Sequence, residues 1–133
     1  EKYPYLAAEE DGELLGYAYV GPFHDRPAYD WAVETSIYVD QNKKRMGIGK
    51  KLHEALEEEL RNRGFLNMNA CIAYPAQEDE YLTRNSVEFH AHLGYRMVGQ
   101  FHQCGYKFHR WYDMVWMEKL IGEHTADQHL PRF

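Results

Sequence analysis

Hydrophobic and polar positions at the start of the chain follow the short spacing of β-strands. Two strand-like runs, residues 5–9 and 14–20, are joined by Asp11-Gly12, a dipeptide that favours the positive backbone angles of a tight hairpin turn. A third run, residues 31–39, is rich in Val, Ile, Thr, Tyr and Trp, which is typical of strands. The pattern therefore predicts a hairpin followed by a third strand.

The hydrophobic spacing then changes to that of an amphipathic helix. Apolar residues recur at helical spacing from Gly47 onward over residues 48–60, and Gly64 supplies a stop. Downstream, Gly94 ends a second, shorter helix, and a loop around residues 105–110 separates the two last strands. The predicted elements after the first helix are a buried strand, the short helix and two final strands, at residues 65–73, 85–92, 95–101 and 111–119.

This order of elements predicts an α/β (α+β) fold with a mixed, mostly antiparallel central sheet flanked by helices. With 133 residues and 44% apolar content, the chain has the size of one compact domain. We assign that domain to residues 1–122 and treat residues 123–133, which show no periodicity, as a C-terminal tail. The lack of a long apolar run or an export signal favours a soluble protein of the cytoplasm.

Charge and cysteine content exclude several classes of protein. The formal net charge of -6 argues against a nucleic-acid binder that works by general electrostatics. Cys71 and Cys104 lie far apart and outside any Cys-x-x-Cys pair, so we expect buried free thiols rather than a disulfide framework or zinc site. His90 and His92 lack the spacing of helical metal ligands, and no metal is expected.

Positive charge is concentrated where the third strand meets the first helix. Five of the 15 Lys and Arg residues lie within residues 43–51. Two glycines in this window let the backbone approach a ligand closely, and a helix N-terminus offers unpaired N–H donors. Lys50 and Lys51 oppose the helix dipole unless an anion offsets both, so the expected ligand is polyanionic. The predicted phosphate cradle consists of Lys44, Arg45, Met46, Gly47, Ile48, Gly49 and Lys50.

An ordinary tight turn into a helix is the alternative interpretation of these glycines. Two other phosphate-binding motifs do not fit. A dinucleotide-binding motif needs a third glycine where Leu52 stands, and a nucleoside triphosphate loop needs Gly-Lys-Ser or Gly-Lys-Thr, whereas Gly49 is followed by two lysines.

The chain resembles the GCN5-related N-acetyltransferase (GNAT) family, in its phosphinothricin acetyltransferase-like branch. That family opens a helix with Gln or Arg, two residues, Gly, one residue, and Gly or Ala; here Lys44 occupies the first position. The resemblance covers nearly the whole chain. It is carried further by Asp11-Gly12-Glu13, residues 28–39, Ser86-Val87, Phe89-His90, Leu93-Gly94-Tyr95, Gly105-Tyr106-Lys107, Trp111 and Asp113.

The resemblance implies the GNAT acyl-CoA N-acyltransferase fold, with an N-terminal strand and helices missing from this chain. It implies transfer of acetyl from acetyl-CoA, the cosubstrate, to the amine of a small molecule, such as an amino acid, phosphinothricin or methionine sulfoximine. A homodimer is expected because dimers are common in the family. The backbone of Ile37, Tyr38 and Val39 would bind the pantetheine arm and the thioester carbonyl, and Asn85 would contact the pantetheine or an adjacent phosphate.

Glu34 is the predicted general base. Strand alternation places it on one face with Ser36 and Tyr38, away from Val33 and Thr35, and burial of a carboxylate raises its pKa towards the working range. The matching glutamate is the proposed base in the resembling enzymes. An ion pair with a nearby Lys or Arg is the alternative.

His90 stands where many enzymes of the superfamily place a tyrosine that protonates the leaving thiolate. A histidine can supply this proton near neutral pH, although a histidine packed on a helix more often has a structural role. The segment with Tyr106, His109 and Trp111 is aromatic and cationic, so it could bind an amino-acid carboxylate or a phosphinyl group. A strand-pairing or dimer surface is the alternative for these residues.

Two other functions fit the same sequence. An acetyltransferase could act on a peptide N-terminus or a polyamine instead of an amino acid. A non-catalytic coenzyme A sensor would keep the basic cradle but would have no need of Glu34.

Overall fold

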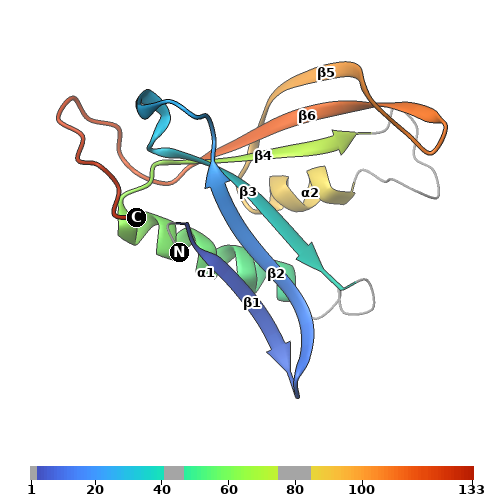
Figure 1. Ribbon diagram of the computed structural model, residues 1–133, viewed down its shortest axis with the longest axis horizontal. Helices are drawn as coiled ribbons and strands as arrows, with labels where there is room; N and C mark the ends of the chain where they lie inside the picture. Colours follow the sequence, from blue (N-terminus) through green and yellow to red (C-terminus); the bar gives the residue numbers. More distant parts are fainter. Residues whose placement is uncertain (1–2, 41–46, 75–84) are drawn as a thin grey trace. The chain divides into compact units, whose positions relative to one another are not determined.

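The structure is a computed structural model that describes residues 3–40, 47–74 and 85–133 (Figure 1). The chain divides into two compact units. The first consists of Glu1–Met68 with Leu120–Phe133, and the second of Asn69–Lys119. Strands and helices occur in both units, and the strand pairs β1–β2, β2–β3 and β5–β6 are antiparallel. The predicted mixed α+β class is confirmed.

Three antiparallel strands form the sheet of the first unit, in the order β1 (Tyr5–Glu10), β2 (Glu13–Pro22) and β3 (Ala32–Val39). The turn between β1 and β2 consists of Asp11 and Gly12, with φ angles of 52° and 80°. Two consecutive positive φ angles are those of the tight hairpin turn that the dipeptide predicted.

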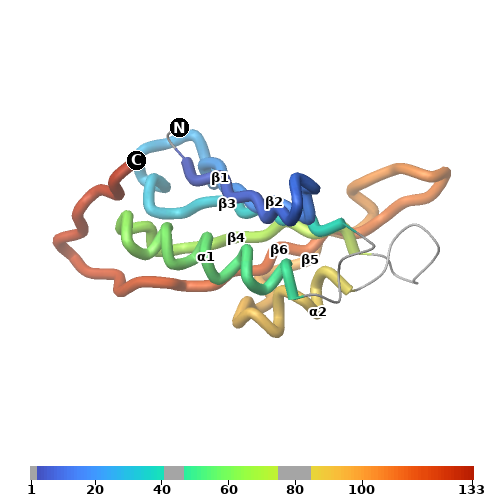
Figure 2. The backbone as a smooth tube through the Cα atoms, turned by 90° about the horizontal axis from the view of Figure 1, so that it is seen from below, coloured from blue at the N-terminus to red at the C-terminus, as the bar shows by residue number. Residues whose placement is uncertain are grey.

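Helix α1 (Ile48–Arg63) covers one face of these strands (Figure 2). The apolar face of the helix packs against the inward-facing residues of β2 and β3, so both apolar surfaces are removed from water. The helix ends where the sequence predicted, because Gly64 adopts a φ of 93° and donates its N–H to the Arg61 carbonyl. The buried residues of this core are Ala18, Val20, Val33, Leu52, Leu56 and Leu60.

Residues 123–133 have no regular secondary structure, yet they belong to the first unit and pack against the end of α1 and the segment before β3. The Trp31 indole donates to the carbonyl of His129 at 2.7 Å, and the Arg132 N–H donates to the carbonyl of Arg63 at 2.7 Å. The Phe133 ring contacts Phe65 edge-on, with centroids 5.6 Å apart. The tail thereby fixes the segment that enters β3.

The second unit contains most of β4 (Asn67–Tyr74), α2 (Asn85–His92), β5 (Arg96–Lys107) and β6 (Arg110–Leu120), with strand order β4-β6-β5. Gly94, with a φ of 98°, follows α2 as predicted. The buried apolar side chains of this unit come from β4, β6 and the residue that precedes β5. They are Ala70, Ile72, Tyr95, Tyr112, Val115 and Met117.

The predicted loop around residues 105–110 is wrong. Strands β5 and β6 continue through this segment, and only Phe108 and His109 form the turn, with φ angles of 53° and 62°. Lys107 pairs with Arg110 directly before the turn. A two-residue turn with positive φ at both positions matches the twist of the strands, and here cross-strand pairing holds two non-glycine residues in it.

The cysteines differ from the expectation in one respect. Cys104 is exposed on β5, an outer strand, and Cys71 is only half-buried, with its sulfur 2.8 Å from that of Met114. Two further searches cover only the parts of the chain that the structure describes. None of the helices there is long and apolar enough to cross a membrane, and no group of three or more His, Cys, Asp or Glu side chains could hold a metal.

Candidate active site

The N-terminus of α1 has the features of an anion-binding site. Gly47 caps the helix with a φ of 72° and no side chain, and the first helical turn contains no acidic residue. The first intrahelical bond runs from the Lys51 N–H to the Gly47 carbonyl, so the N–H groups of Ile48 to Lys50 have no acceptor within the helix. Lys50 is exposed at this end. Lys44, Arg45 and Met46, the other predicted cradle residues, lie outside the described residues.

Gly16 brings this helix end close to the end of β3. A β-carbon added at Gly16 would lie 2.6 Å from the Tyr38 carbonyl oxygen, 3.2 Å from the Val39 Cα and 3.3 Å from a methyl carbon of Leu52 on α1. Only a residue without a side chain permits this approach. The predicted contacts at Ile37, Tyr38 and Val39 are therefore on the strand end that lies beside the first turns of α1.

Glu34 lies on the face of β3 that points away from α1. Its neighbours Val33 and Thr35 are 0% and 8% exposed, whereas Glu34, Ser36 and Tyr38 are half-buried or exposed. This confirms the face that strand alternation predicted. No cationic side chain among the described residues of the same unit forms an ion pair with Glu34, so the alternative of a structural ion pair gains no support there.

A row of stacked tyrosines covers the same face of the sheet. Tyr17 stacks on Tyr38 with ring centroids 5.3 Å apart, and Tyr5 stacks on Tyr17 and Tyr19 at 5.8 and 5.7 Å. Tyr5, Tyr19 and Tyr38 are each 40–53% exposed. Sequence reasoning missed this row. The alternation of Tyr17 and Tyr19 on one strand was its only signal, because the stacking depends on the register between strands.

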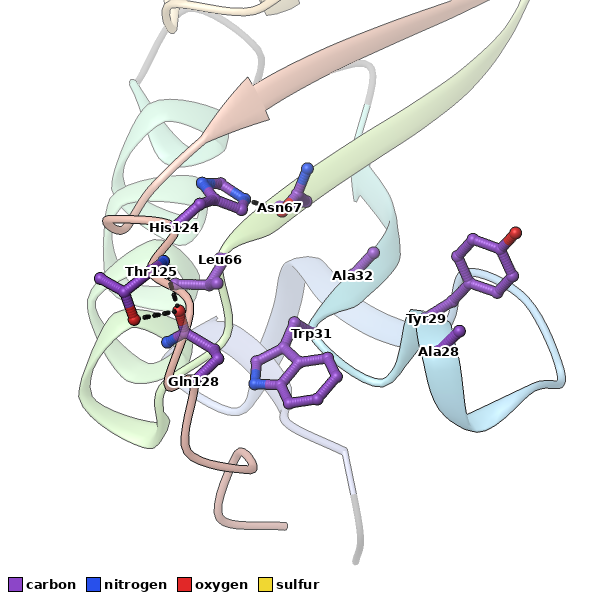
Figure 3. Close-up of a pocket in the computed structure, with 9 residues that line it drawn as sticks. All are labelled: Ala28, Tyr29, Trp31, Ala32, Leu66, Asn67, His124, Thr125 and Gln128. Carbon is purple, nitrogen blue, oxygen red and sulfur yellow. Dashed lines mark hydrogen bonds between the residues drawn. The ribbon is translucent and has the colours of Figure 1, made fainter.

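A cavity of about 320 Å³ lies at the opposite end of β3 (Figure 3). Its polar side chains bond to one another. His124 Nε2 lies 2.8 Å from the side-chain oxygen Oδ1 of Asn67, and the Thr125 hydroxyl donates to the side-chain oxygen Oε1 of Gln128 at 3.1 Å. The cavity begins at Ala32, about 20 Å along the strand from the predicted cofactor contacts at its other end. It is not the predicted site.

His90 is enclosed within the second unit. Its side chain is 4% exposed and packs edge-on against the rings of Phe89 and Tyr95, with centroids 5.4 and 4.9 Å away. Burial lowers the pKa of the imidazole, and the hydrogen bond from Nδ1 to the Ser86 carbonyl opposes this only partly. Because a carbonyl only accepts, the proton is on Nδ1, and Nε2 carries the lone pair. Asn85, the other predicted residue of this helix, is the first residue of α2.

The predicted substrate residues lie near the tip of the β5–β6 hairpin. Tyr106 pairs with Trp111 across the strands, with ring centroids 5.1 Å apart, and His109 is in the turn. All three are exposed. The structure thus brings Tyr106 and Trp111 into direct contact.

Asp113 stabilises a bulge near the middle of the same hairpin. The sequence pattern did not predict this structural role. Its carboxylate accepts the Gln103 backbone N–H at 2.8 Å and the Gln100 side-chain amide at 2.6 Å. These hydrogen bonds lower the pKa of Asp113. Gln103 has a φ of 49°, so the carboxylate stabilises a backbone angle that is unusual for glutamine.

Comparison with known proteins shows the family. The Acetyltransferase (GNAT) domain matches residues 1–116. The chain is 35% identical to the phosphinothricin N-acetyltransferase of Streptomyces viridochromogenes over 119 residues. This aligned region covers 90% of this chain and 61% of that protein. It is also 35% identical to the L-methionine sulfoximine/L-methionine sulfone acetyltransferase of Salmonella typhimurium, over 93% of this chain and 68% of that protein.

A solved structure agrees with this. The phosphinothricin acetyltransferase of Sinorhizobium meliloti, crystallised with acetyl-CoA, superposes with a TM-score of 0.82 and 35% identity, over 95% of this chain and 65% of that one. The chain thus spans less than two thirds of the length of some of these relatives. On the match over residues 1–116 and the identity to these enzymes, the chain belongs to the GNAT acetyltransferase family.

Proposed function

We propose that this protein is an N-acetyltransferase that moves acetyl from acetyl-CoA to the amine of an amino acid or an amino-acid-like small molecule. The observation that carries the proposal is the N-terminus of α1, which has a glycine cap and no side-chain capping bond and which packs beside the end of the strand that bears Glu34. The relatives named above act on phosphinothricin and on methionine sulfoximine or sulfone, which supports an amino-acid-like acceptor.

Each part of the reaction has a candidate residue. The N–H groups at Gly47 to Lys50 and the two lysines bind the pyrophosphate of the cosubstrate, and Asn85 contacts its pantetheine. A backbone N–H within Ile37 to Val39 polarises the thioester carbonyl. Glu34 removes a proton from the acceptor ammonium, directly or through a water, and the free amine attacks the carbonyl carbon. The carbon–sulfur bond then breaks, and the thiolate takes up a proton.

His90 is the predicted donor of that last proton. His90 can donate this proton only after its imidazole takes one up at Nε2. The neutral ring has its one proton on Nδ1, which donates to the Ser86 carbonyl. The neutral ring has a lone pair on Nε2, so it can pass on a proton there but has none of its own to donate. We therefore propose that Nε2 of His90 takes up the second proton, which the attacking nitrogen loses as the amide forms, and passes it to the thiolate; packing against Tyr95 is the alternative role.

Tyr106, His109 and Trp111 are proposed as substrate contacts. The rings of Tyr106 and Trp111 supply an exposed aromatic surface, and His109 in the turn adds a polar group. Such a set suits the carboxylate or phosphinyl end of the acceptor.

The proposal is tested by thiol release from acetyl-CoA. The purified protein is assayed with amino acids, phosphinothricin, methionine sulfoximine, methionine sulfone, polyamines and peptides, and acetyl-CoA binding is measured separately by calorimetry. We expect one amino-acid-like acceptor to accelerate thiol release. Turnover with a peptide or polyamine instead would change the substrate class, tight binding without any turnover would indicate a coenzyme A sensor, and absence of binding would refute the cradle.

We further propose a homodimer that forms through the β5–β6 hairpin. Strand β5 is the outer strand of its unit. Exposed apolar side chains that gather on an edge strand mark an interaction site. Cytoplasmic location is part of the same proposal, because acetyl-CoA, the proposed cosubstrate, is an intracellular metabolite. Apart from the proposed substrate contacts, three apolar side chains of the hairpin are at least half exposed: Val98, Phe101 and Phe108.

Light scattering tests the dimer. We expect twice the mass of the chain for the wild type and a monomer for the double variant Val98→Lys with Phe101→Lys, because two desolvated charges would disrupt an apolar interface. Leu130→Lys, which changes an exposed side chain of the tail, should remain dimeric. A monomeric wild type would contradict the proposal.

A further inference from the structure

Gly21 lies directly opposite Glu34 in the register of β2 and β3. Residues paired across antiparallel strands point to the same face, with β-carbons about 5 Å apart. A side chain at position 21 would therefore stand beside the Glu34 carboxylate, on the face that points away from α1. Because the residue is glycine, that place holds no side chain.

The backbone gives no reason for a glycine at this position. Gly12 and Gly47 adopt positive φ angles and Gly16 is pressed against Tyr38, but Gly21 has neither constraint. A β-carbon built on Gly21 meets no described atom within 4 Å beyond its chain neighbours, and the β2–β3 register runs through it without a shift. Gly21 is the second-last residue of β2, and a glycine within a strand weakens the strand and often marks close approach of a ligand.

The surroundings of Glu34 on this face are unequal. Along β3 its neighbour is Ser36, which pairs with Tyr19 of the tyrosine row. Across the strand pair lies the gap at Gly21. Toward Ser36 the Glu34 carboxylate is therefore bordered by side chains. Toward Gly21 the described residues leave open space, so an acceptor whose amine reaches Glu34 has room above Gly21.

We propose that Gly21 is a specificity-determining position, which keeps open the space that the acceptor's carbon skeleton occupies when its amine reaches Glu34. This inference rests on the proposed acetyltransferase function. A side chain at position 21 would overlap the acceptor without disturbing the fold or the cosubstrate site. Gly21 would be a positioning residue, because Glu34 remains the group that accepts the proton.

Two variants of increasing size test the inference. Gly21→Ala adds one methyl group and Gly21→Val adds a branched side chain that strands favour. We expect kcat/KM for the acceptor to fall from wild type to Ala to Val, by about 10-fold or more for Val, since misfit of one methylene already changes specificity by about 10- to 200-fold. The loss should appear mainly in the acceptor KM. The KM for acetyl-CoA and the melting temperature should stay at wild-type values.

Gly99 offers a matched control, because it lies in β5, has no positive φ and also meets no described atom within 4 Å at its β-carbon position. Gly99→Ala and Gly99→Val should leave the acceptor KM unchanged. If the wild type turns over an acceptor and Gly21→Val does so equally well, the role of Gly21 is refuted while the proposed function stands. If Gly21→Ala raises both KM values or melts early, the effect is a general distortion and the inference is refuted. If the wild type turns over no acceptor, the proposed function fails and the inference fails with it.

Discussion

Replacing Glu34 with glutamine is expected to lower kcat for the best acceptor by about 10²- to 10⁴-fold, the range that general-base catalysis contributes. Glutamine has nearly the same shape, but its amide cannot take a proton from the acceptor ammonium. Acetyl-CoA affinity should be retained, because the proposed phosphate contacts lie at Gly47 to Lys50 and not at Glu34. Thiol release at saturating acceptor and calorimetric titration with acetyl-CoA measure the two quantities separately.

Glu9→Gln is the control for this substitution. Glu9 is an exposed carboxylate on β1, so its replacement makes the same change in charge without touching β3. Its kcat should equal that of the wild type. Undiminished turnover by Glu34→Gln would remove the general base from the proposed mechanism, and a similar loss in both variants would indicate a general effect of charge.

Replacing Gly16 with alanine is expected to destabilise the protein by about 1–3 kcal/mol, the usual cost of an extra carbon atom in a filled space. The added methyl would lie 2.6 Å from the Tyr38 carbonyl oxygen, which is backbone and can move only with β3. The melting temperature should fall by several degrees, as measured by circular dichroism. Because β3 and α1 would be forced apart at the proposed cofactor site, acetyl-CoA affinity should fall as well.

Gly21→Ala is the matched control for stability, since it makes the same change five positions further along β2, where the β-carbon meets open space. Its melting temperature should equal or exceed that of the wild type, because alanine restricts the unfolded chain more than glycine does. Equal stability of the two variants would mean that β2 and β3 separate at Gly16 at little cost. In that case the close approach of β3 and α1 would not depend on this glycine.

The local sequence pattern was sufficient to predict the structure where neighbouring residues alone determine the backbone conformation. The turn at Asp11-Gly12 and the end of α1 at Gly64 follow from backbone angles that few other residues adopt. The face of Glu34 follows from strand alternation, because successive side chains must point to opposite sides. The phosphate cradle was predicted for the same reason, since the glycine cap and the two lysines all lie within residues 47–51.

Local pattern failed where a residue's conformation depends on a distant partner. Phe108 and His109 form the hairpin turn with positive φ angles because the strands on either side pair through Lys107 and Arg110. The sequence pattern placed Gly105 in a loop, because it does not show that Gly105 pairs with Tyr112 on the neighbouring strand. The exposure of Cys104 and the burial of His90 depend likewise on where the strand and the helix pack.

The sequence by itself thus determined the order of the elements, the family resemblance, the basic glycine turn and the side of β3 that bears Glu34, since each of these is set by residues a few positions apart. Only the tertiary structure distinguished Gly16, which is in contact with β3 and α1, from Gly21, which faces open space beside Glu34. The two glycines lie on one strand and look alike in the sequence. Their difference arises from strand register and helix packing, which bring together residues that are far apart along the chain.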